Sequence, residues 1–125
     1  MNVVDSSAWL EYFADGPNAG YFAEAIENEE TLVVPAITLF EVYKRVFTQR
    51  GEESAWQAVT AMQAGRVVDV NASLALAAAR ISADHRLPMA DSLILATARA
   101  YSAVLWTQDS DFDGFQGVNY KARKA

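Results

Sequence analysis

Cysteine is absent from this 125-residue sequence, and histidine occurs only once. Without cysteine the protein has no disulfide bonds and no thiolate metal ligands, and a cytoplasmic location is the default expectation. No stretch approaches the ~20 consecutive apolar residues of a membrane-spanning helix. The amino terminus, MNVVDSSAWL, has neither the basic residues nor the small-residue cleavage pattern of a secretory signal. We therefore expect one cytoplasmic domain without membrane contact.

Positive charge is also scarce. Ten lysine and arginine residues stand against sixteen aspartate and glutamate residues, which gives a net charge of −6. This balance argues against a protein that holds nucleic acid by overall positive charge. A nucleic-acid substrate then requires either a local cluster of basic residues or a bound cation that offsets the carboxylates.

Several common catalytic motifs are missing. The sequence has no GxxxxGK phosphate loop, and no serine has the partners of a catalytic triad. The single histidine, His85, lies between Asp84 and Arg86 near an expected helix end. A solvated capping role is favoured there over that of a catalytic base. The remaining candidates for chemistry are the carboxylates.

Short apolar runs rich in valine alternate with helical patterns along the chain. Strands are expected at residues 2–5, 32–35, 66–70 and 103–107, with a last short strand near 118–120. Helices are expected between them, including one that Pro35 opens and Gly51 ends. This order predicts an α/β fold of three layers, α/β/α, with a central, mainly parallel sheet of four to five strands. The domain is expected over residues 1–120, followed by a basic tail at 121–125.

Aromatic residues are frequent in the first half of the chain. Phe40, Tyr43 and Phe47 are expected to mark the buried side of the helix over 36–50, which puts Glu41 near the edge of the core. The large apolar residues of the early helices exceed what a small core needs, so we expect some at interfaces with other chains. The candidates are Trp9, Phe13, Phe22, Phe47 and Trp56.

Four acidic residues lie where the ends of strands and the amino-terminal turns of helices are expected to converge. Asp5 ends the first strand, Glu41 lies in the second turn of the helix after the second strand, Asp91 lies in the first turn of the helix opened by Pro88, and Asp109 follows the fourth strand. In open α/β sheets, ligands bind beyond the carboxyl ends of the strands. Taken singly, each acid has an ordinary structural explanation, such as a helix cap for Asp5, an ion pair for Glu41 or the helix dipole for Asp91. However, Asp91 interrupts the apolar run LPMADSLILATA, where burial without a partner is expensive. A purely structural explanation does not lead us to expect all four acids at the same edge of one sheet.

The stretch TQDSDFDGF has a second interpretation. Asp109, Asp111 and Asp113, followed by Gly114, fill the first half of a calcium-loop pattern. Such a loop needs a helix before it and a glutamate at its twelfth position, but the segment before it is strand-like and the twelfth residue is Tyr120. The calcium loop is therefore the poorer interpretation, and Asp113 is expected to face solvent or cap the turn.

Four segments carry a resemblance to a known family. VVDSSAWLEYF, VVPAITLFEVYK, LPMADSLILATA and VLWTQDSDFDGF, in this order, resemble the PIN-domain ribonucleases, in particular the VapC-type toxins of bacterial toxin–antitoxin pairs. The resemblance runs from about Asn2 to Tyr120 and implies a single PIN-like domain. It implies a catalytic set of Asp5, Glu41, Asp91 and Asp109, metal ligands Asp5, Asp91 and Asp109 with Asp111 as a further candidate, and supporting hydroxyls at Ser6 and Thr107.

Clustered carboxylates repel one another unless they bind a proton or a cation, and hard oxygen ligands select Mg²⁺ or Mn²⁺. The predicted activity is hydrolysis of RNA by a metal-activated water. Lys44 and Arg45 are candidates for guiding the RNA, whereas the tail is expected to be a disordered, solvated end. The resemblance also implies a cognate antitoxin in the active-site groove and a homodimer.

Two other functions stay open at the level of sequence. The same fold can serve as a binding module that does not cleave, and related folds cut structured DNA. Binding of RNA without cleavage in Mn²⁺ would favour the first, and a preference for branched DNA would favour the second.

Overall fold

The computed structural model describes residues 1–124 of the chain. Within them, five strands form one sheet in the order β3-β2-β1-β4-β5, and every neighbouring pair is parallel. The strands are β1 (Asn2–Val4), β2 (Leu32–Pro35), β3 (Arg66–Val68), β4 (Val104–Thr107) and β5 (Val118–Tyr120). The predicted parallel sheet is therefore confirmed, including its last strand.

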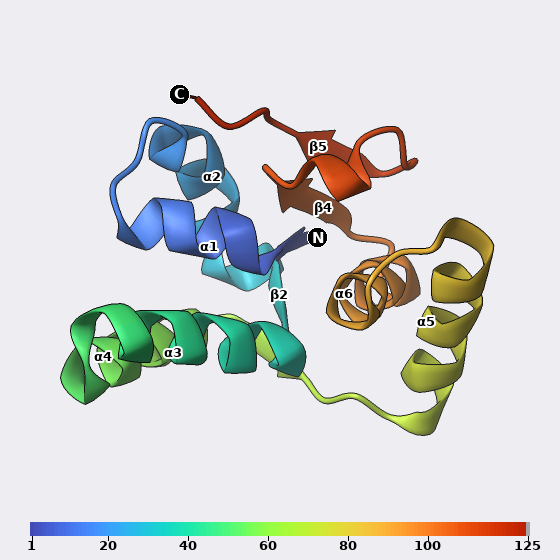
Figure 1. Cartoon of the computed structure of the whole chain (residues 1–125), viewed down its shortest axis with the longest axis horizontal. Helices are drawn as coiled ribbons and strands as arrows, with labels where there is room; N and C mark the ends of the chain where they lie inside the picture. The colour runs from blue at the N-terminus through green and yellow to red at the C-terminus, as the bar shows by residue number, and fades with distance from the viewer. Residues whose placement is uncertain (125) are drawn as a thin grey trace.

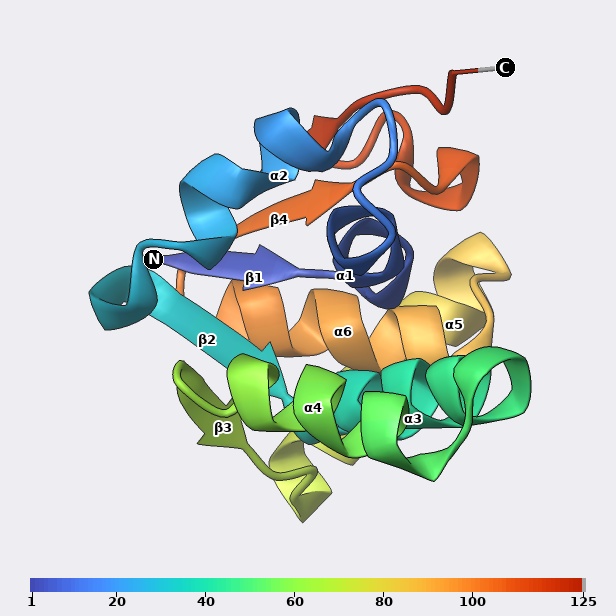
Figure 2. The same cartoon turned by 90° about the vertical axis from the view of Figure 1, so that its left-hand side faces the viewer.

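Six helices and two short 3₁₀ turns connect the strands. They are α1 (Ser6–Phe13), α2 (Ala19–Ile26), η1 (Glu29–Thr31), α3 (Ala36–Arg50), α4 (Glu52–Met62), α5 (Ala72–His85), α6 (Met89–Ala100) and η2 (Ser110–Phe112). Figure 1 shows α5 and α6 on one side of the sheet and α1 and α2 on the other, and Figure 2 shows α3 and α4 in front of α5 and α6. The three-layer α/β/α architecture is confirmed.

Successive residues of the strands face opposite sides of the sheet, so each strand contributes to two cores. Val3, Val33 and Leu105 pack with α5 and α6, whereas Val4 and Val34 pack with α1, α2 and α4. All of these side chains are nearly inaccessible to solvent. Burial on both faces explains why the strands read as continuous apolar runs in the sequence.

Because all strands are parallel, their carboxyl ends lie along one edge of the sheet. In Figure 2 the arrowheads of β1 and β4 point to the same side, where α1 begins. The pairing of Val4 with Trp106 places Asp5 and Thr107 next to each other immediately beyond these two strands. This edge is where the sequence places the acidic residues.

The buried face of α3 differs from the prediction. Phe40 is 61% exposed and Phe47 is 47% exposed, while Thr38 and Val42 are fully buried. The aromatic residues lie toward α4, where the centroids of the Tyr43 and Trp56 rings are 5.2 Å apart. The prediction was wrong for Phe40 and Phe47, because α4 packs beside α3 and leaves these two rings at the exposed edge of the helix pair. It holds for Tyr43, which is half-buried against the core.

The ends of two segments also differ from expectation. β3 stops at Val68 because its partner β2 ends at Pro35, where α3 begins, so residues beyond Val68 have no strand to pair with. In the tail, the Lys121 amide donates to the Thr107 carbonyl at 2.9 Å, and the Asn18 side chain donates to the Ala122 carbonyl at 3.0 Å. A disordered end is therefore wrong for these two residues, and Ala125 lies outside the described residues.

No helix within residues 1–124 combines the length and the apolar character that crossing a bilayer requires.

Candidate active site

Asp5 lies between β1 and α1 and is 2% exposed. One carboxylate oxygen, Oδ1, accepts hydrogen bonds from the Ala8 amide at 2.9 Å and the Ser7 hydroxyl at 2.8 Å. The other, Oδ2, accepts one from the Thr107 hydroxyl at 2.6 Å. Asp5 is thus the amino-terminal cap of α1 and is also held by β4. A carboxylate has about four lone-pair sites, so three accepted bonds leave room for one more ligand.

Burial raises the pKa of Asp5 to about 6. The hydrogen bonds from Thr107, Ala8 and Ser7 act in the opposite direction because they stabilise the ionised form. Repulsion from Asp109 adds to the effect of burial. The pKa of this buried carboxyl group therefore lies close to neutral pH, and a nearby positive charge would stabilise its ionised form.

Glu41 lies in the second turn of α3 and is half-buried. Its Oε1 accepts a hydrogen bond of 2.6 Å from the hydroxyl of Ser6, the first residue of α1. This bond joins the helix after β1 to the helix after β2. The predicted supporting residue Ser6 therefore holds Glu41, whereas Thr107 holds Asp5.

Asp91 lies in the first turn of α6 and is half-buried. Its pKa is raised to about 7 by burial and then by repulsion from Asp109, Asp5, Glu41 and Asp111, in that order. Those four carboxyl groups come from the turn after β4, the β1–α1 junction, α3 and η2, so Asp91 lies within the electrostatic reach of all of them. A cation at this position would relieve the repulsion.

Asp109 and Asp111 lie in the turn after β4. The Asp109 amide donates to the Thr107 hydroxyl at 2.9 Å, and the Asp109 carboxylate accepts from the Asp111 amide at 2.9 Å. One carboxylate oxygen each from Asp91, Asp109 and Asp111 lie within 4.8 Å of one another. A divalent cation with oxygen ligands at ~2.0–2.6 Å fits this spacing. The three oxygens therefore suit a hard cation, and Asp111 belongs to the group although it is exposed.

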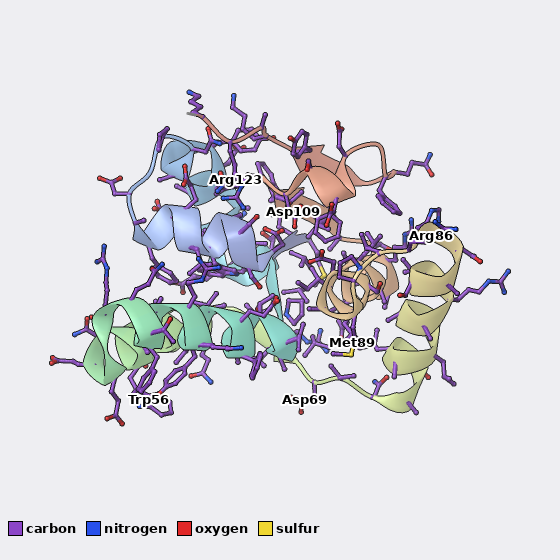
Figure 3. The ribbon with its side chains drawn as sticks, in the orientation of Figure 1. Trp56, Asp69, Arg86, Met89, Asp109 and Arg123 are labelled. Carbon is purple, nitrogen blue, oxygen red and sulfur yellow. The ribbon has the colours of Figure 1, made fainter. Side chains whose placement is uncertain are left out.

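The four predicted acids line one pocket of about 400 Å³. Figure 3 places Asp109 near the middle of the molecule, between α1 and α6. The remaining lining residues come mainly from α1 and α3 and include both predicted basic residues: Ser6, Ser7, Leu10, Phe40, Lys44, Arg45 and Thr48. We refer to this cavity as the acid pocket. Thr107 lies fully buried beneath it.

The residues that the sequence excluded lie elsewhere. His85 is exposed at the end of α5, and its ring packs against Phe115 at 4.9 Å between centroids. Asp113 is exposed at the end of η2.

A buried polar network behind the acid pocket was missed in the sequence. The Ser7 hydroxyl, which donates to Asp5, accepts from the Gln108 amide at 3.4 Å. Gln108 in turn accepts a 3.1 Å hydrogen bond from Asn18, which is 1% exposed and lies in the loop before α2. No sequence signal identifies Asn18 or Gln108, because their roles depend on a contact between residues 90 positions apart.

Fold and site together define a class of protein: a parallel α/β domain with a carboxylate-lined pocket at the carboxyl ends of its strands. The PIN domain model matches residues 3–117, and the chain belongs to the PIN-domain family. PIN domains are nucleases, so hydrolysis of phosphodiester bonds is the activity that the family indicates.

Solved structures share this fold at low sequence identity. A toxin–antitoxin complex from Klebsiella pneumoniae matches with a TM-score of 0.84 and 20% identity over 99% of this chain and 100% of that chain. The sarcin–ricin loop cleaving toxin VapC20 from Mycobacterium tuberculosis matches with a TM-score of 0.77 and 20% identity over 94% and 98% of the two chains.

VapBC2 from Rickettsia felis, bound to a DNA fragment from its promoter, matches with a TM-score of 0.74 and 16% identity over 97% of each chain. No curated protein sequence gave a significant match.

Proposed function

We propose that this protein is a metal-dependent endoribonuclease of the VapC type that acts in the cytoplasm as the toxin of a toxin–antitoxin pair. The observation that carries the proposal is the convergence of Asp5, Glu41, Asp91 and Asp109 on one pocket, from four separate elements of a PIN domain. Each acid taken singly has a structural explanation, but a shared pocket with two raised pKa values favours a cation site.

The carboxylates provide the proposed metal ligands. Asp91, Asp109 and Asp111 would each supply one oxygen to Mg²⁺ or Mn²⁺, and Asp5 would supply the lone pair that its hydrogen bonds leave free. When bound there, such a cation would lower the pKa of an attacking water and stabilise the charge of the reacting phosphate. The chain itself keeps the ligands in place, since the Thr107 hydroxyl contacts both Asp5 and the Asp109 amide.

Glu41 has a different role in the proposed reaction. Ser6 fixes it on the α3 side of the pocket. Like Asp5, it contributes no oxygen to the close group of three carboxylates, and unlike Asp5 it is only half-buried. We assign it to orienting the water nucleophile by hydrogen bonding.

Lys44 and Arg45 are the proposed RNA-binding residues. Both are exposed, both are basic, and both line the acid pocket. In a chain with a net charge of −6, such a local pair is what an RNA backbone needs beside a carboxylate site. They would hold the phosphates that flank the scissile bond.

We also propose a cognate antitoxin and a homodimer. A groove of about 380 Å³ between α1, α3 and α4 shares Ser7, Leu10 and Arg45 with the acid pocket. A segment of an antitoxin lying in this groove would reach the carboxylates and block them. The exposed Trp56 of α4 offers apolar area for a second copy of the chain.

The decisive experiment compares the wild type with Asp91→Asn on a pool of structured RNAs that includes transfer RNAs and a sarcin–ricin loop fragment. Each protein is incubated with Mn²⁺, Mg²⁺ or EDTA. We expect the wild type to cut only with metal and the variant to lose cutting by at least about 100-fold, because one metal ligand is gone. Equal cutting by both proteins would refute the site. Binding without cutting would support a binding module, and a preference for branched DNA would replace RNA as the substrate.

A further inference from the structure

Phe40 stands out on the rim of the acid pocket. It directly precedes the predicted catalytic Glu41, lines the same pocket as the four acids, and is 61% exposed. The core does not need this ring, because Thr38 and Val42 provide the fully buried face of α3. A large aromatic ring left in water beside a charged pocket is available to a ligand.

Polar residues follow Phe40 along the edge of α3 that borders the acid pocket. Lys44 and Thr48 lie one and two turns further on, at the four-residue spacing that aligns side chains along a helix, and both line the acid pocket. The Lys44 ammonium lies 5.9 Å from the centre of the Phe40 ring. The strip therefore offers a π face, a positive charge and a hydroxyl in succession, beginning next to the carboxylates.

A nucleic-acid strand is complementary to this strip, because it presents flat bases beside phosphate charges. We propose that Phe40 stacks on a base adjacent to the scissile phosphate while Lys44 holds the neighbouring phosphate. This inference rests on the proposed RNA cleavage and adds a substrate-binding residue to it. Because phenylalanine has no hydrogen-bonding group, the stack selects for an unpaired base rather than for its identity.

The acids alone do not provide this selection. Carboxylates and a cation interact with phosphates, which every nucleotide carries. A base can lie flat on Phe40 only if it leaves its own stack, so a nucleotide held in a duplex is disfavoured at this position. Phe40 therefore acts as a filter for unpaired positions in a folded RNA.

Phe47 provides a matched control. It lies on the same helix and is 47% exposed, but it lines a second hollow between α3 and α4 and not the acid pocket. Phe40 lines both. A contact with another protein over this hollow would involve both rings, whereas a contact with a base at the scissile bond would involve only Phe40.

The test uses a short RNA hairpin that the wild type cuts, with 2-aminopurine placed next to the cut site, and the full-length variants Phe40→Ala, Phe40→Leu, Phe40→Trp and Phe47→Ala. Base–aromatic stacking predicts that Phe40→Ala and Phe40→Leu weaken RNA binding by about 5- to 150-fold and abolish the quenching of 2-aminopurine. Phe40→Trp and Phe47→Ala should retain both the RNA affinity and the quenching of 2-aminopurine. Mn²⁺ affinity should be unchanged in all variants.

Several outcomes would overturn the inference. If the wild type cuts RNA and Phe40→Leu binds and quenches like the wild type, Phe40 is not a stacking residue, although the proposed function stands. If Phe40→Ala and Phe47→Ala change the oligomeric state alike while RNA binding is unaffected, the ring belongs to a protein interface. If the wild type cuts no RNA with any metal, the proposed function fails first, and this inference fails with it.

Discussion

Thr107 connects two of the acids through one hydroxyl group. It donates to the Asp5 carboxylate at 2.6 Å and accepts from the Asp109 amide at 2.9 Å, and it is fully buried. Asp5 and Asp109 are therefore held relative to each other by the protein itself. The sequence identified Thr107 only as a supporting residue, because this bridge depends on the alignment of β1 with β4.

Replacing Thr107 with valine keeps the shape of the side chain but removes the bridge. We expect Thr107→Val to lower the free energy of unfolding by about 1–3 kcal/mol, because it leaves a buried acceptor on Asp5 and the partly buried amide of Asp109 without a partner. The pKa of Asp5 should rise above about 6, since the Thr107 hydrogen bond lowers it. Urea unfolding and the pH dependence of cleavage measure the two effects. Thr107→Ser is the control, because it retains the hydroxyl, and a loss of equal size in Thr107→Ser would contradict the explanation.

Asp91 makes the stability of the metal-free protein depend on pH. Its pKa is raised from 3.8 to about 7 in the folded state, so folding favours the protonated form. The stabilisation is complete below the unfolded pKa and is lost as the pH rises through about 7. Asp5, whose pKa is raised to about 6, contributes in the same direction.

We therefore expect the wild type in EDTA to be less stable at pH 8 than at pH 5, with Asp91 accounting for about 1–2 kcal/mol of the difference after allowance for solvent screening. Asp91→Asn should remove the contribution of Asp91 to this stability difference, and Mn²⁺ should restore the stability of the wild type at pH 8. Thermal unfolding at the two pH values tests this. Asp113→Asn, at an exposed position outside the acid pocket, should behave like the wild type. An unchanged pH dependence in Asp91→Asn would show that Asp91 is not the titrating group.

At the scale of elements, the alternation of apolar runs and helical patterns was sufficient to predict the strands, because parallel strands buried on both faces have a distinct composition. The carboxyl edge of the sheet then followed, and with it the gathering of Asp5, Glu41, Asp91 and Asp109. The buried face of α3 was not predictable in the same way. That face depends on where α4 packs, because the spacing of Phe40 and Phe47 alone is compatible with either a buried or an exposed side of the helix.

The junction of α3 and α4 depends on glycine. Gly51 has φ +91° and ψ 179°, a conformation that other residues rarely adopt. We expect Gly51→Ala to cost about 1–3 kcal/mol in stability. Gly20→Ala is the matched control, because Gly20 lies in α2 with no atom within 4 Å of an added Cβ, and there alanine should stabilise by about 0.4–1 kcal/mol. Chemical unfolding of both variants measures the difference, and equal effects would contradict the backbone explanation.

At the scale of the whole molecule, the charge distribution predicts how salt affects the proposed binding of RNA. Lys44 and Arg45 are the basic residues of the acid pocket in a chain of net charge −6. With two phosphates neutralised, the slope of log affinity against log salt should be about −1.4 for a single strand, and Lys44→Ala should reduce it by about 0.7. Arg80→Ala is the control, because Arg80 is exposed on α5 and does not line the acid pocket.

Fluorescence titration of RNA at several salt concentrations, with Mn²⁺ held constant, gives these slopes. A slope near −4 would instead require a wider basic surface. The first candidates for it would be Lys121, Arg123 and Lys124, because they form the basic group nearest in sequence to the turn that carries Asp109.

The order in which the acids occur along the chain also bears on how the protein is made. Asp5 is synthesised first, but the hydroxyl that holds it and the carboxylates of the last turn come about a hundred residues later, on β4 and just beyond it. A nascent chain that ends before Asp109 lacks part of the acid pocket. A ribosome that translates this protein therefore completes most of the domain before the acid pocket, and with it the nuclease site that the family indicates, can form.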